Sequence, residues 1–124
     1  MKLLLDTHVV LWWRIDSRRL KPAIRRAIGL AEIVWVSAAS GWEVAIKQAL
    51  GKLRLQDSFA QMVLASGFLE LPVTLRHAEQ LVKLPDHHAD PFDRMLVAQA
   101  RCEDATIVTH DRQFELYEVP VMWV

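Results

Sequence analysis

The chain has 124 residues, 52% of them hydrophobic and 24% charged, a balance typical of one globular domain with its own core, here expected to span residues 1–124. No apolar run approaches the roughly 18 residues of a membrane helix, and Asp6 interrupts Leu3-Leu4-Leu5 too early for a secretory signal, so we expect a cytoplasmic protein without membrane contact. Fifteen basic residues balance fifteen acidic ones, which gives no general sign of nucleic-acid binding, and the single Cys102 excludes an internal disulfide or a thiolate zinc cage.

The predicted elements alternate between short strands and helices. Apolar, β-branched runs predict strands at residues 2–5, 33–37, 68–72, 106–109 and 119–123. Helical spacing predicts helices at residues 7–15, 22–31, 41–50, 58–66, 75–82 and 91–103, with a short helical turn after Asp111. Apolar strands separated by helices predict an α/β fold, a three-layer α/β/α sandwich around a central, mainly parallel five-stranded sheet. Ligands of such sheets bind beyond the carboxyl ends of the strands.

Residues suited to helix ends support these bounds. Asp57 and Thr74 are expected as N-caps, and Pro22 and Pro91 as first helical residues. Gly51 and Gly67 are expected just past helix C-termini. A run of basic residues overlaps the first two helices: Arg14, Arg18, Arg19, Lys21, Arg25 and Arg26. Two interpretations of this run are open, a surface that contacts phosphates or a partner and an ordinary solvated helix face.

Two acidic residues follow predicted strands. Asp6 comes directly after Leu3-Leu4-Leu5, and Asp111 follows Ile107-Val108-Thr109-His110, so both are expected at the carboxyl edge of the sheet. Asp6 could instead only cap the next helix. Thr109 could hydrogen-bond to a metal-bound water or only complete the turn.

Two more acids lie where helices open at the same edge. Glu43 follows the second strand, although Ser40 and Glu43 also match the S-x-x-E pattern of a capping box. In Asp90-Pro91-Phe92-Asp93-Arg94, Asp90 is a natural N-cap and Pro91 a first helical residue. Asp93 is then placed to face a ligand, although stabilisation of the helix dipole would also explain it.

Asp6, Glu43, Asp93 and Asp111 would together bring carboxylates from four segments to one edge of the sheet. Crowded carboxylates repel and raise one another's pKa, and cations make such crowding tolerable. Mg²⁺, with Mn²⁺ as its alternative, prefers these hard oxygen ligands. With two ions roughly 4 Å apart, one would activate water and the other would stabilise the leaving oxygen of a phosphodiester. The pattern predicts a metal-dependent nuclease, with one or two ions left open.

Four parts of the sequence resemble PIN-domain nucleases: Leu5-Asp6-Thr7, Trp42-Glu43, the run Asp90-Pro91-Phe92-Asp93-Arg94-Met95-Leu96-Val97-Ala98-Gln99-Ala100, and Thr109-His110-Asp111. Within that family the chain looks most like the VapC type, the ribonuclease toxins of toxin–antitoxin systems. The resemblance implies metal-binding, catalytic acids at Asp6, Glu43, Asp93 and the more variable Asp111. It implies supporting positions for Thr7, Thr109 and Asp90, the last outside the metal's direct ligands.

The resemblance also implies an Mg²⁺- or Mn²⁺-dependent endoribonuclease with an RNA substrate, a homodimer, and a small cognate antitoxin that blocks the acidic site. Two related functions stay open: a PIN nuclease that acts in RNA processing or on DNA, and an inactive PIN scaffold that only binds a partner. A receiver-type signalling domain is disfavoured, because Asp6 has no acidic neighbour and no lysine follows Lys83.

The histidines and tryptophans give weaker expectations. His8 is expected to be structural, and His77, His87, His88 and His110, which form no helical zinc pair, are expected at the surface. Of five tryptophans, the adjacent Trp12 and Trp13 cannot both face inward on one helix, which leaves one either for an interface or partly exposed beside the core.

Overall fold

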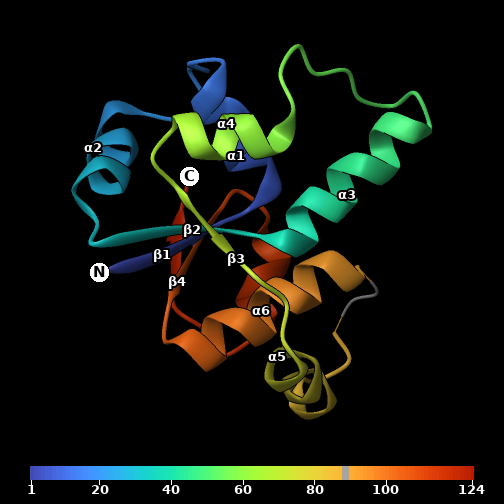
Figure 1. Ribbon diagram of the computed structural model, residues 1–124. Helices are drawn as coiled ribbons and strands as arrows, with labels where there is room; N and C mark the ends of the chain where they lie inside the picture. Colours follow the sequence, from blue (N-terminus) through green and yellow to red (C-terminus); the bar gives the residue numbers. More distant parts are fainter. Residues whose placement is uncertain (88–89) are drawn as a thin grey trace.

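The computed structural model describes residues 1–87 and 90–124 and has a five-stranded sheet at its centre (Figure 1). The strands lie in the order β3-β2-β1-β4-β5, and their bounds are β1 (Lys2–Leu5), β2 (Ile33–Ser37), β3 (Leu69–Leu71), β4 (Thr106–Thr109) and β5 (Val121–Trp123). In the central strand, Leu5 lies in register with Val36 of β2 and Val108 of β4. Every pairing is parallel, so the predicted fold is confirmed and the sheet is wholly, not mainly, parallel.

Helices cover both faces of the sheet. Figure 1 shows α1, α2 and α4 on one side and α5 and α6 on the other. The helices are α1 (Thr7–Arg14), α2 (Pro22–Leu30), α3 (Ala38–Ala49), α4 (Phe59–Ala65), α5 (Leu75–Gln80) and α6 (Pro91–Glu103), with 3-10 turns η1 (Leu81–Lys83) and η2 (Arg112–Leu116). Within the described residues, none of these helices has the length and apolar character to cross a membrane.

Alternate strand residues point to opposite faces and form two cores. On one face, Leu3, Leu5 and Val108 pack with residues of α1, α2 and α4. On the other face, Leu4 and Ile107 pack with residues of α6 and η2. All five side chains are fully buried, which explains why these strands are apolar on both sides.

The order in which successive strands are added to the sheet reverses at β1. The chain passes from β1 through β2 to β3 on one side and then crosses back to β4 on the other side of β1. The segments that leave β1 and β4 therefore pack on opposite faces, α1 with the first core and Phe114 of η2 with the second. In doubly wound sheets this switch point is where ligands bind, and Asp6 and Asp111 follow these two strands.

The start of α3 differs from the prediction. The helix begins at Ala38 rather than Gly41, because β2 leads directly into it and the Ser37 hydroxyl caps it by accepting a hydrogen bond from the Ala39 N–H (3.0 Å). The alternative interpretation, a capping box between Ser40 and Glu43, is therefore wrong. The buried Ser40 hydroxyl has no hydrogen-bond partner among the described residues.

Other helix ends agree in part. Thr74, Pro22, Pro91 and Asp90 stand at the expected N-terminal positions, and Gly51 (φ 71°) and Gly67 (φ 75°) follow α3 and α4 with the positive φ that glycine tolerates. Ser58, not Asp57, caps α4, in a capping box with Gln61.

His77 contradicts its predicted surface position. It is 1% exposed, and its Nδ1 accepts a hydrogen bond from the Thr74 N–H (3.1 Å) while its Nε2 lies 2.8 Å from the Glu103 carboxylate. Partners from two elements allow a polar ring to be buried. His8 and His110 are exposed, and His88 lies outside the described residues.

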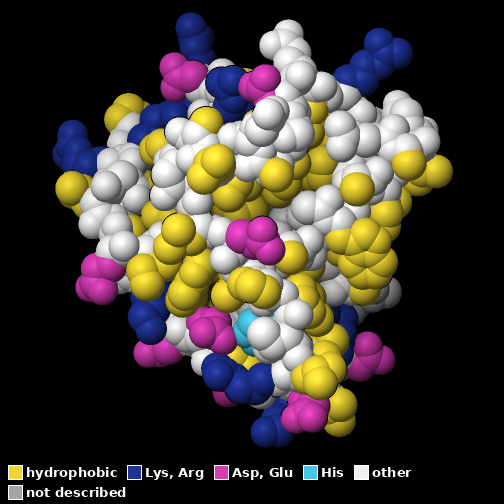
Figure 2. Space-filling view, viewed as in Figure 1, with side chains coloured by type: hydrophobic (Ala, Val, Ile, Leu, Met, Phe, Trp, Pro, Cys, Tyr) yellow, Lys and Arg dark blue, Asp and Glu magenta, His cyan; other side chains and the backbone are white. Residues whose placement is uncertain are grey.

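An apolar cavity of about 650 Å³ lies between α3, α4 and the β3 edge, where Figure 2 shows hydrophobic side chains around a hollow. Its lining includes Val44, Phe59, Val63 and Phe68 and none of the candidate acids. This apolar cavity therefore shares no lining residue with the cavity that contains Asp6, Glu43, Asp93 and Asp111.

We expect Ser58→Ala to destabilise the protein by about 1 kcal/mol, because it removes the N-cap of α4, and to lower Tm by about 4 °C. Asp57→Asn breaks only the exposed ion pair with Arg14 (2.6 Å) and should cost less than half as much. Thermal unfolding of both variants checks this. A larger loss from Asp57→Asn would mean that Asp57 holds the helix end after all.

Candidate active site

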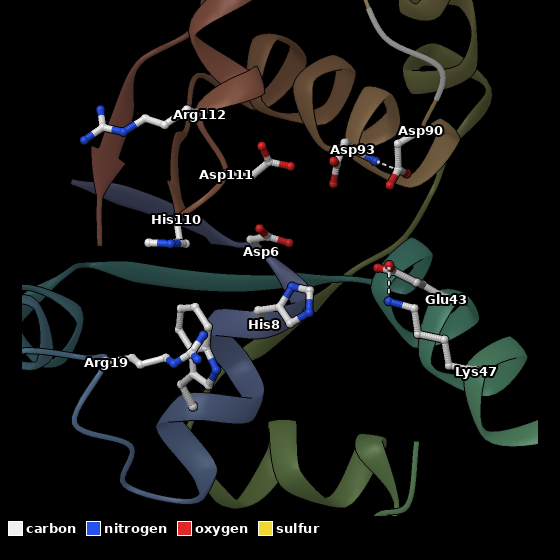
Figure 3. A pocket seen from close by; sticks show the side chains of 11 residues that line it. Asp6, His8, Arg19, Glu43, Lys47, Asp90, Asp93, His110, Asp111 and Arg112 are labelled. Carbon is white, nitrogen blue, oxygen red and sulfur yellow. Dashed lines mark hydrogen bonds and ion pairs between the residues drawn. The ribbon is translucent and has the colours of Figure 1, made fainter. Parts of the chain in front are cut away.

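Asp6, Glu43, Asp93 and Asp111 line one cavity of about 460 Å³ at the carboxyl edge of the sheet. Figure 3 shows Asp6 at its centre, with Asp93 and Asp111 on one side and Glu43 on another. The carboxylates come from the end of β1, α3, α6 and the β4–η2 connection, which are far apart in sequence. The remaining lining residues are His8, Trp12, Arg19, Lys47, Asp90, His110 and Arg112.

Asp6 is a buried carboxylate that does not cap its helix. It occupies the N-cap position of α1, yet its side chain makes no capping hydrogen bond. Its Oδ2 instead accepts a hydrogen bond from the Thr109 hydroxyl (2.7 Å), and the residue is 6% exposed. Burial raises the pKa of Asp6, and the bond from Thr109 and the nearby His8 partly oppose that rise. The alternative in which Asp6 caps the next helix is therefore wrong.

Thr109 connects Asp6 to Asp111. Its hydroxyl donates to Asp6 and also accepts a hydrogen bond from the Asp111 N–H (3.0 Å). The Asp111 carboxylate accepts a hydrogen bond from the Gln113 N–H (2.9 Å) and so caps η2 while it lines the cavity. Of the two roles considered for Thr109, the structure shows completion of the turn and adds the support of Asp6.

Glu43 is held by two donors. Its Oε1 accepts a hydrogen bond from the Thr7 hydroxyl (2.8 Å), and its Oε2 lies 3.0 Å from the Lys47 ammonium. The Glu43 side chain is 13% exposed and that of Lys47 is 39% exposed, so the carboxylate of this ion pair is largely shielded from water while the lysine remains partly solvated. Thr7 thus orients the Glu43 carboxylate, and Lys47 neutralises part of the acidic charge.

Asp93 lies in the first turn of α6, beside the cap of that helix. Asp90 Oδ1 accepts hydrogen bonds from the N–H groups of Phe92 (2.9 Å) and Asp93 (3.1 Å), which confirms Asp90 as the N-cap. Burial, followed by repulsion from Asp6, Asp90 and the other acids, raises the pKa of Asp93 from 3.8 to about 8. The four acids are therefore close enough to interact electrostatically.

The donor chemistry of the cavity fits a hard divalent cation. It offers several carboxylate oxygens and no thiolate, and two of its acids, Asp6 and Asp93, are destabilised in their charged form by burial and by neighbouring acids. Within residues 1–87 and 90–124, no three acidic, histidine or cysteine side chains form a ready-made metal cage. The acids surround an open space, the arrangement that suits a cation retaining several of its waters.

The basic run separates into different roles. Arg14 pairs with Asp57, and Arg25 pairs with Asp16 (3.1 Å), whereas Arg19 lines the acidic cavity. Sequence reasoning did not single out Arg19 from the run, because its position depends on the loop between α1 and α2. It also missed Lys47, although the i,i+4 spacing from Glu43 was a visible signal.

Comparisons with known proteins agree with this architecture. Residues 3–120 match the model of the PIN domain family. Ribonuclease VapC22 of Mycobacterium tuberculosis is 32% identical over 125 residues, which cover 94% of this chain and 92% of that protein.

Solved structures are similar in fold. VapBC2 from Rickettsia felis, bound to a DNA fragment from their promoter, has a TM-score of 0.75 at 12% identity and covers 98% of both chains. The toxin–antitoxin complex from Klebsiella pneumoniae has a TM-score of 0.66 at 16% identity, over 98% of this chain and 96% of that one. The family match covers all four candidate acids, and the chain therefore belongs to the PIN-domain family, in its VapC branch.

Proposed function

We propose that this protein is a cytoplasmic, Mg²⁺- or Mn²⁺-dependent endoribonuclease, the toxin of a type II toxin–antitoxin system, that hydrolyses RNA phosphodiester bonds at the acidic cavity. The observation that carries the proposal is the convergence of Asp6, Glu43, Asp93 and Asp111, from four separate elements, on one cavity. The similarity to a ribonuclease, VapC22, supports the choice of substrate.

The residues of the cavity would hold a cation and orient the reacting groups. When bound, divalent cations stabilise charge on a phosphodiester that undergoes in-line displacement and lower the pKa of water. Asp6 and Asp93, the acids with raised pKa, would be principal ligands, with Glu43 and Asp111 beside them. The hydroxyls of Thr109 and Thr7 fix the side chains of Asp6 and Glu43 before any ligand arrives.

Removal of one acid should abolish cleavage without unfolding the protein. Asp6→Asn and Asp93→Asn should each lower the cleavage rate by about 100-fold or more, because a ligand oxygen and its charge are lost. The assay is cleavage of total cellular RNA by purified protein in Mg²⁺, Mn²⁺ or EDTA. Asp57→Asn, an acid outside the cavity, is the matched control and should retain activity.

The outcomes separate the alternatives. Discrete fragments that require metal and disappear with Asp93→Asn support the ribonuclease. Fragments of equal yield from wild type and Asp93→Asn would show that the active site lies elsewhere. Intact RNA in all conditions, from a protein whose Tm does not change with metal, would favour the inactive scaffold.

In EDTA we expect stability to decrease as the pH rises between about 4 and about 8. The unfolded chain releases the Asp93 proton near its ordinary pKa of 3.8, whereas the folded state keeps it until about pH 8. Asp93→Asn removes this titration, so its Tm should decrease less over that range. Thermal unfolding at several pH values checks the prediction, with Asp57→Asn expected to follow wild type.

Added metal gives a second readout of the same charges. Mg²⁺ or Mn²⁺ should raise the Tm of wild type near pH 8 and raise that of Asp93→Asn much less, because ligand binding stabilises the folded state by mass action. A Tm equally raised in both proteins would argue against a cation at this cavity.

The proposal includes a small antitoxin that covers the acidic cavity with a basic side chain, and a homodimer of the chain. The net negative lining around Asp6 and Asp93 favours a cationic insert. Addition of the candidate antitoxin should stop RNA cleavage, and an antitoxin with that basic residue changed to Gln should inhibit less. Sedimentation should give about twice the 14.3 kDa chain mass, and a stable monomer would contradict the dimer.

A further inference from the structure

One side of the acidic cavity is basic and aromatic. The Arg19 guanidinium lies over the Trp12 ring, 5.2 Å from its centroid. The ring centroids of His8 and His110 each lie 5.9 Å from that of Trp12. These residues come from α1, the α1–α2 loop and the β4–η2 connection, so the tertiary fold brings them together.

This side faces the carboxylates across the cavity. Figure 3 shows Arg19 and His110 on one side, Asp90, Asp93 and Glu43 on the other, and Asp6 between them. Among the described residues, the Arg19 guanidinium has no acidic partner within ion-pair distance. It is exposed, and its contact is the indole of Trp12.

The combination matches the chemistry of a nucleotide. A guanidinium binds phosphate oxygens through paired N–H donors, and the imidazole of His8 can donate to phosphate or sugar oxygens. Nδ1 of His110 already lies 3.1 Å from the Val124 carbonyl oxygen, so His110 borders the subsite through the rest of its ring. Indole and guanidinium planes are also stacking faces for unpaired bases. Arg19 is already stacked on Trp12, so less side-chain freedom is lost when it binds a ligand.

An acidic active site needs such a cationic neighbour. Carboxylates attract a divalent cation but repel the phosphates that flank the bond to be cut. A cation on the opposite side of the same cavity can hold a flanking phosphate while the reacting one lies at the acids. In Figure 3 Arg19 lies on the opposite side of Asp6 from Asp93 and Glu43, which provides this arrangement even though Lys47 pairs with Glu43.

We propose that Trp12, Arg19 and His110, with His8 beside them, form a nucleotide subsite that holds single-stranded RNA next to the bond cut at the carboxylates. This inference rests on the proposed ribonuclease function and names the residues that bind the strand. Arg19 contacts a phosphate, and the Trp12–Arg19 pair provides the stacking surface for an adjacent base.

The test measures binding of a short single-stranded oligoribonucleotide in Mg²⁺. Asp93→Asn serves as the parent, so that the RNA stays intact and the fold is retained. Adding Arg19→Gln should weaken binding about tenfold and reduce the slope of log K against log salt by about 0.7, the loss of one phosphate contact. Adding Arg26→Gln, which removes an exposed arginine of the same run that does not line the cavity, should change binding less than about twofold.

Kinetics of the active protein provide an independent readout. Arg19→Gln should raise KM for a short RNA about tenfold and leave kcat within about threefold, because the subsite binds the strand and does not touch the cleaved bond. Trp12→Phe keeps an aromatic face and should retain more binding than Trp12→Leu. A folded Trp12→Leu variant with wild-type affinity would contradict the stacking role.

The outcomes keep this inference apart from the function on which it rests. If wild type cuts RNA and Arg19→Gln binds and cuts like Arg26→Gln, the subsite is wrong and the ribonuclease stands. The subsite is equally wrong if Arg19→Gln weakens antitoxin binding alone. If wild type neither binds nor cuts RNA in Mg²⁺ or Mn²⁺, both proposals are wrong.

Discussion

The hydrogen bond from Thr109 to Asp6 joins β1 and β4, the two neighbouring strands at which the strand order of the sheet reverses. The parallel register pairs Leu5 with Val108, so the next residues along β1 and β4 are Asp6 and Thr109, and the hydroxyl meets the carboxylate at 2.7 Å. Both residues are buried, at 6% and 0% exposure. A buried carboxylate without a donor is strongly unfavourable, so the position of β4 beside β1 is what makes Asp6 tolerable at this edge.

The rest of the cavity follows from the same electrostatic constraint. Thr109 also holds the backbone of Asp111, and Thr7 and Lys47 hold Glu43. These donors stabilise individual carboxylates, yet the pKa values of Asp6 and Asp93 remain raised, so the neutralisation is incomplete. A folded protein keeps such an arrangement when a ligand completes it, and strongly perturbed groups in a cavity are a common sign of a functional site.

Much of this site could be predicted, because the signals were local. An acid directly after an apolar strand, as at Asp6, is fixed at the carboxyl edge by a single strand assignment. Glu43 was identified although the start of its helix was misplaced, since the shift from Gly41 to Ala38 moved it by one turn without removing it from the edge. Asp90 and Asp93 followed from the first-turn preferences of helices.

The parts that could not be predicted depend on tertiary contacts. Periodicity gives no sign that His77 lies between Thr74 and Glu103, or that Arg19, in an irregular loop, returns to the ring of Trp12. The capping box that the spacing of Ser40 and Glu43 allowed is not formed, because Ser37 caps the helix earlier, at the end of β2. Helix caps and hydrophobic periodicity depend on residues close in sequence. The side of the cavity opposite the acids, with Trp12, Arg19 and His110, is formed by residues that are close only in the folded structure.

The loop that carries Arg19 shows how one basic run serves two purposes. Arg25 donates hydrogen bonds to the carbonyl oxygens of Trp12 (3.4 Å) and Ser17 (3.2 Å) and pairs with Asp16, whose φ of 54° marks the sharp turn after α1. Arg25 therefore stabilises the conformation of the loop between α1 and α2. Its guanidinium lies over Trp13 (5.4 Å), as that of Arg19 lies over Trp12. A divalent cation held by carboxylates can promote cleavage of any phosphodiester within reach, so selectivity for a substrate must come from the residues around the cavity. A loop anchored by one arginine and presenting another at the cavity is suited to that role, because its sequence can change without disturbing the acids.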